Sequence, residues 1–212
     1  MRITRTGLGL VIGAVGALTL TTHAAAQAHA HMGHVADSWG DTPEGAGLLP
    51  TAVTEAEIAA QHASLAASAG DLAGMKRHIA HVLHAIDPTV EAAGPGKGYG
   101  VVKAAAGAAT HIRLAGEAAD ASDNVKAHAN HVGTAAENVG KWAARVVELG
   151  NQIKATDDAA AAAEMVAEVA FITQAMVGGT DANDDGRTSW GADEGGLEQA
   201  SFHMNLMKQG EG

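Results

Sequence analysis

The sequence predicts an all-α protein, most simply an antiparallel helical bundle of about four to five main helices, followed by a loop and a short terminal helix. Three observations carry this prediction. Alanine, the best helix former, dominates the chain. No stretch shows the sustained two-residue alternation that indicates a half-buried strand. Glycine, proline and capping residues divide the apolar segments into helix-sized pieces.

Start and stop signals locate the expected helices. Thr54 and Glu57 form a capping box, Asp71 is a typical N-cap, and Pro88 ends a helix at the residue before it. A cluster of glycines makes 88–100 a loop. These signals predict helices over about 54–69, 71–87, 101–121, 123–155 and 158–177, and a last one over 197–208.

The N-terminus has the features of a secretory signal. Two arginines precede an apolar run over 7–20, and a small-x-small motif at 26–28 resembles a cleavage site. We therefore expect a periplasmic or extracellular mature chain with no membrane-spanning segment, and the cut is left open between Ala28 and Ala30. The resulting organisation is a signal peptide, a flexible His-containing arm, a His-rich bundle, and a C-terminal loop with its helix, at 1–28, 29–50, 51–178 and 179–212.

Charge and composition exclude several classes of function. Loss of the signal lowers the basic count from 13 to 11 against 24 acidic residues, a net charge near −13. This acidity argues against nucleic acid as a partner and is compatible with metal ions. Because the chain has no cysteine, it has no disulfide, no Cys-based zinc site, no iron–sulfur cluster and no covalently attached haem.

The histidines are the main functional signal. His78, His81 and His84 follow one another at three-residue steps and form a slanting ridge on one helix. At about 1.5 Å of rise per residue, one histidine from each of four helices lies about 10–16 Å from its turn. The sequence therefore predicts a single middle layer of imidazoles that binds copper or zinc, made by His62, His78, His81, His111 and His131.

Two alternatives remain open at this point. The first is a non-covalent haem b for electron transfer, held by paired imidazoles among His78, His81, His84, His111, His128 and His131. The second is a structural or interaction bundle whose histidines only pack. In the leading hypothesis the protein is not an enzyme but stores, delivers or sequesters the metal, and dimerisation of the bundle is left open.

Two further segments carry candidate ligands. In the arm, His31 would be the third residue after a cut at Ala28, where it can join a square-planar Cu(II) or Ni(II) chelate. Near the C-terminus, His203 with Met204 and Met207 offers soft ligands for Cu(I), although such methionines more often fill a core.

The segment Asp181-Ala-Asn183-Asp-Asp185-Gly-Arg187-Thr-Ser189 resembles the opening of an EF-hand or dockerin-type calcium loop. The resemblance implies calcium as an accessory cofactor, with side-chain ligands from Asp181, Asn183 and Asp185 and the carbonyl of Arg187. Position 12 of the loop is alanine instead of the expected bidentate glutamate, so the loop is expanded and closed by Asp193 or Glu194, or the site is weak.

Overall fold

The computed structural model describes residues 27–212, so residues 1–26 of the expected signal lie outside the described residues, whereas Gln27 and Ala28 belong to helix α1. Within that range the chain is all helical, as the sequence predicts, with no strand. The helices are α1 (Gln27–Ala36), α2 (Leu48–Ala67), α3 (Leu72–Ile86), α4 (Val101–Glu117), α5 (Asp123–Ala155), α6 (Ala159–Gly178) and α7 (Leu197–Glu211), with a short 3-10 helix, η2 (Pro43–Gly45).

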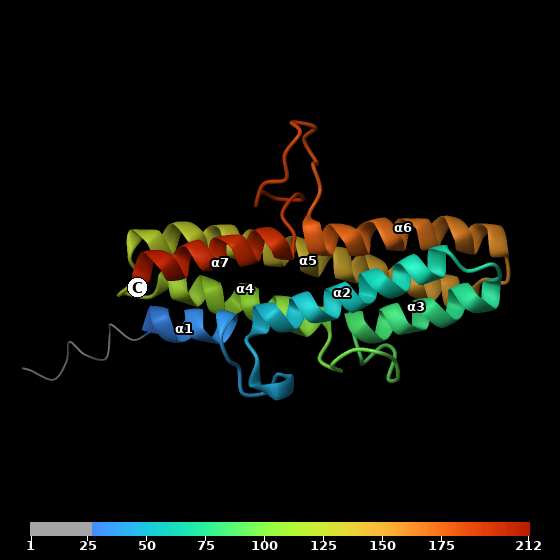
Figure 1. The fold of residues 1–212 in the computed structure, drawn as a ribbon, viewed down its shortest axis with the longest axis horizontal. Coiled ribbons are helices and arrows are strands. Elements are labelled where there is room, and N and C mark those ends of the chain that lie inside the picture. The colour runs from blue at the N-terminus through green and yellow to red at the C-terminus, as the bar shows by residue number, and fades with distance from the viewer. Residues whose placement is uncertain (1–26) are drawn as a thin grey trace, which may run out of the picture.

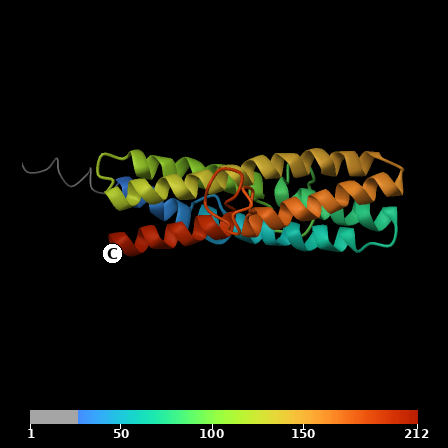
Figure 2. The ribbon, with the colours of Figure 1, turned by 90° about the horizontal axis from the view of Figure 1, so that it is seen from above.

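The helices form four antiparallel rods, and three of these rods are interrupted near the middle. In Figure 1, α1 and α2 follow one another along the first rod, and α3 and α4 return along the second. The uninterrupted α5 is the third rod, and α6 and α7 together make the fourth, an arrangement that the view from above confirms (Figure 2). The loops at the interruptions span residues 37–47, 87–100 and 179–196.

The ends of several helices match their sequence signals. Asp71 caps α3 through its side chain, which accepts a hydrogen bond from the Gly74 N–H at 2.6 Å. Asp158 caps α6 in the same way. The long helix α5 is capped by Ser122, one residue before the expected Asp123.

Two expectations for the N-terminal part are wrong. The stretch 29–50 is not a flexible arm, because it contains most of α1, which packs against α4. The capping box at Thr54 does not start a helix either. The first-rod helix α2 already begins at Leu48, and the Thr54 hydroxyl donates to the Pro50 carbonyl inside it. Its N-cap is Gly47, where any Cβ would lie 2.6 Å from the Ala36 carbonyl carbon.

The core is made mainly of alanine, valine, isoleucine and leucine from all four rods. Small residues let the rods approach closely: a Cβ on Gly116 of α4 would lie 2.9 Å from that of Ala129 on α5. Among residues 27–212, α6 alone is long and apolar enough to span a membrane, and its buried face packs against α2 and α5.

Candidate metal centres

Nine histidines gather into three clusters of three in the described part of the chain. We name them triad 1 (His31, His34, His111), triad 2 (His62, His78, His81) and triad 3 (His128, His131, His203). All nine side chains are half-buried. In each triad the three candidate ligand atoms lie within 4.8 Å of one another, so one ion could be shared by three imidazoles.

The three triads share one construction. Two histidines three residues apart lie on one helix, where they are about 60° apart around the axis and one turn apart along it. The third comes from an antiparallel helix in a neighbouring rod. The helix pairs are α1 with α4, α3 with α2, and α5 with α7.

The nitrogen spacing in each triad suits a metal ion. The Nδ1 atom of His111 lies 2.9 Å from that of His31 and 3.4 Å from that of His34. The corresponding distances are 3.3 and 3.3 Å around His62, and 3.1 and 3.2 Å around His203. Around a tetrahedral zinc with Zn–N bonds of about 2.0–2.1 Å, two ligand nitrogens are separated by about 3.3 Å.

Hydrogen bonding alone does not account for two short contacts at one nitrogen. An imidazole Nδ1 has a single in-plane site, which is either an N–H or a lone pair. The Nδ1 of His111, like those of His62 and His203, therefore satisfies only one of its two neighbours well. Three lone pairs directed at a common point are, in contrast, what a metal ion requires.

The surroundings favour the neutral form of six of these nine imidazoles, because their pKa values are lowered. Burial lowers the pKa of His203 to about 4, with further lowering by His131 and His128. Burial also lowers the pKa of five more triad members, and neighbouring imidazoles add to the effect, at His31, His62, His81, His111 and His131. A neutral imidazole is the form that binds metals, so protons compete weakly at neutral pH.

The predicted single layer of imidazoles is wrong, because its five members are distributed over all three triads. Only His62, His78 and His81 meet as expected. His111 and His131 lie at matching depths on adjacent helices, yet His111 faces α1 and His131 faces α7. The number of residues from a turn fixes how far along the rod a side chain lies. The direction in which it points also changes by about 100° with each residue, so two side chains at the same depth can face different helices.

Four ligands were missed or differently assigned from the sequence. His31 and His34 were expected in a flexible arm and His128 only in the haem alternative. His203 was expected in a Met-containing Cu(I) site, whereas Met204 and Met207 are buried in the core. The sequence feature that the triads share is a His-x-x-His pair, at 31/34, 78/81 and 128/131; the pair 81/84 has the same spacing but forms no triad. The expected N-terminal chelate does not fit, because the ring of His31 belongs to triad 1 and its backbone to α1.

His84, the third member of the predicted ridge, belongs to no triad. It is buried, and its Nδ1 lies 2.8 Å from the Glu91 carbonyl, to which it donates. The loop closes over this ring, since a Cβ on Gly94 would lie 2.7 Å from the His84 Cβ. The haem alternative is not supported either: imidazole nitrogens 2.9–3.4 Å apart leave no room for a porphyrin between them.

In the acidic C-terminal loop, side-chain oxygens accept hydrogen bonds from backbone N–H groups of the same loop. Asp181 accepts N–H groups from Asp185 and Gly186, and Asn183 accepts from Asp185. Glu194 is buried and its Oε2 accepts from the Ser189 N–H and hydroxyl. Calcium binding here, with Asp185 and the Arg187 carbonyl among the ligands, stays a prediction from the resemblance.

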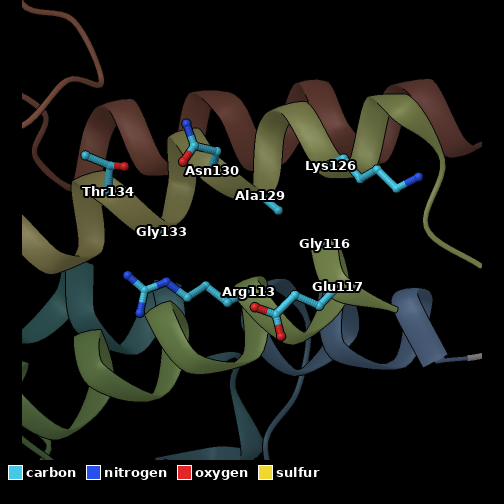
Figure 3. Close-up of a pocket in the computed structure, with 8 residues that line it drawn as sticks. All are labelled: Arg113, Gly116, Glu117, Lys126, Ala129, Asn130, Gly133 and Thr134. Carbon is cyan, nitrogen blue, oxygen red and sulfur yellow. The ribbon is translucent and has the colours of Figure 1, made fainter. Parts of the chain in front are cut away.

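A groove between α4 and α5 is separate from the triads. Figure 3 shows the residues that line it, which include Arg113, Glu117, Lys126 and no histidine. Arg113 pairs with Glu137, so its charge is already engaged within the protein. Each triad, in contrast, brings three ligand nitrogens together, and the triads are therefore the stronger candidate for function.

Comparison with known protein families, with curated proteins and with solved structures gave no match to this chain.

Proposed function

We propose that this protein binds transition metal ions, copper or zinc first, with one ion at each histidine triad. The observation that carries the proposal is the convergence of two Nδ1 atoms on a third at 2.9–3.4 Å, repeated on three pairs of helices. Imidazole suits zinc, copper, nickel and iron, so the ligand type limits the candidate metals to this group but does not select one of them.

The number of sites favours storage, delivery or sequestration over catalysis. A chain of 212 residues with three equivalent-looking triads has a large metal capacity for its size. The net charge of −11 would also favour the accumulation of cations near the surface. We place this function in the periplasm or outside the cell, on the strength of the signal expected at the N-terminus.

Metal analysis with single substitutions tests the proposal. The purified protein, stripped with a chelator and reloaded with Zn²⁺ or Cu²⁺, should bind three equivalents. The variants His111→Ala, His62→Ala and His203→Ala should each lose one equivalent, because each removes the histidine that the other two contact. Elemental analysis after gel filtration gives the stoichiometry.

His29→Ala is the matched control. His29 lies on α1 close to triad 1 in sequence, but its ring is exposed and its nearest charged partner is Glu211 at 3.9 Å. This variant should keep all three equivalents. Unchanged stoichiometry in the three triad variants, or no retained metal in the parent protein, would overturn the proposal.

A further inference from the structure

Trp39 lies against triad 1. The centroid of its ring is 4.7 Å from that of His34 and 4.6 Å from that of His111, so one indole contacts two of the three imidazoles. Its backbone is fixed in the 37–47 loop. The Trp39 N–H donates to the Ala46 carbonyl at 3.1 Å, and the Trp39 carbonyl accepts from the Thr42 hydroxyl at 2.8 Å.

Trp190 occupies a similar position at triad 3. Its ring stacks on His131 with 4.0 Å between centroids and 21° between planes. The loop that carries it is held by the buried Asn138 of α5. The Asn138 amide donates to the carbonyls of Gly191 and Gly195 at 2.8 and 3.1 Å, and its oxygen accepts from the Asp193 N–H at 2.9 Å.

Triad 2 has no such neighbour. Across residues 27–212, no tryptophan, tyrosine or phenylalanine ring packs against its three imidazoles. These rings contact one another, with centroids 4.7–5.8 Å apart. The two indoles come from loops that interrupt the first and fourth rods, whereas α2 and α3 are joined by a short turn at 68–71.

We infer that triads 1 and 3 release metal slowly and that triad 2 is the site through which metal exchanges. The inference rests on the proposed metal binding. An imidazole must rotate away from the ion before the ion leaves, and a packed indole opposes that rotation. Packing that holds ligands in their bound geometry acts mainly by slowing dissociation. Loss of an outer-shell hydrogen-bond partner, which orients a ligand in a comparable way, typically weakens metal binding about 10–100-fold.

Zinc release to a chelator tests the inference. The protein loaded with three equivalents of Zn²⁺ is mixed with an excess of a chromophoric chelator in a stopped-flow instrument. We expect one equivalent to transfer in a fast phase and two in slower phases. His62→Ala should remove the fast phase, whereas His111→Ala and His203→Ala should each remove one slow equivalent.

Substitution of the indoles gives the decisive comparison. Trp190→Leu should accelerate release of one slow equivalent by about tenfold or more, and Trp39→Leu should accelerate the other. Asn138→Ala, which frees the loop and keeps the indole, should accelerate the same phase as Trp190→Leu. The control is Trp142→Leu, since Trp142 packs against the core and not against a triad.

The outcomes separate this inference from the proposed function. Three equivalents released in a single phase, or Trp190→Leu and Trp39→Leu proteins that stay helical by circular dichroism and release zinc at the parental rate, would overturn the inference alone. Failure to retain zinc would overturn the proposed function with it.

Discussion

Glu55 is the strongest test of how the interrupted second rod is held together. This glutamate of α2 is fully buried, and its carboxylate accepts N–H groups from Lys97, Tyr99 and Gly100 at 3.1, 2.9 and 3.1 Å. These residues lead into α4, so one side chain fixes the point at which the rod resumes. Gly96 lies so close that a Cβ there would be 2.6 Å from Oε2.

Glu55→Ala should cost about 3–5 kcal/mol of unfolding free energy. The substitution removes three hydrogen bonds to a charged acceptor, and an unsatisfied buried donor costs about 1–3 kcal/mol. Water entering the space lowers the sum of the three losses. For a chain of this size, the change corresponds to a fall in Tm of about 6–20 °C.

Urea unfolding followed by circular dichroism measures this loss. Glu57→Ala on the same helix is the control, because Glu57 is exposed and should change stability by less than about 0.5 kcal/mol. Glu55→Gln keeps one acceptor oxygen for the loop, so its loss of unfolding free energy should lie between those of Glu55→Ala and Glu57→Ala. A Glu55→Ala protein within about 1 kcal/mol of the parent would refute the role assigned to this carboxylate.

Three further predictions concern the triads and the acidic loop. The lowered pKa values mean that the unfolded chain binds more protons below pH 6.5. The metal-free protein should therefore lose stability as pH falls from about 6.5 towards 4, and a constant urea midpoint would contradict the assigned pKa directions. The double substitution Phe202→His with His203→Phe keeps the composition but turns the imidazole by about 100°, so one metal equivalent should be lost; retention of all three would show that helix rotation does not matter. Calcium uptake by calorimetry should be lost in Asp185→Ala and kept in Asp193→Ala, because the Asp193 carboxylate faces Lys141 at 3.5 Å; equal uptake by both variants would argue against the resemblance.

Helix positions were largely predictable because their signals are local. Asp71 and Pro88 set the two ends of α3 through local effects on the backbone that act within a few residues. The start of α2 was not predictable from local signals. Leu48 and Leu49 are helical because they are buried against the rest of the fold, and this burial outweighs the local capping preference of Thr54.

The ligand sets were less predictable than the helices because they depend on rotation and on rod pairing. Along one helix, the pair His78 and His81 shares a face by geometry alone. Which lone histidine completes it depends on the rod that packs against that face. The distance from the turn identified His62 correctly. It wrongly paired His111 with His131, because it says nothing about the direction in which each side chain points around the helix axis.

The placement of the histidines indicates that the triads are a specific feature of the chain and not a by-product of its composition. Nine of the eleven histidines within residues 27–212 lie in triads, and each triad takes two from one helix and one from its antiparallel neighbour. The α5–α6 half of the third and fourth rods, from residue 132 to 196, carries none. Histidines scattered by chance on an alanine-rich bundle would lie singly on its surface, where each ring is solvated and keeps an ordinary pKa. Here the same side chains meet in groups, where burial and neighbouring imidazoles lower the pKa of six of them: His31, His62, His81, His111, His131 and His203. The lowered pKa values cost the metal-free fold stability below pH 6.5, and ion binding would offset this cost.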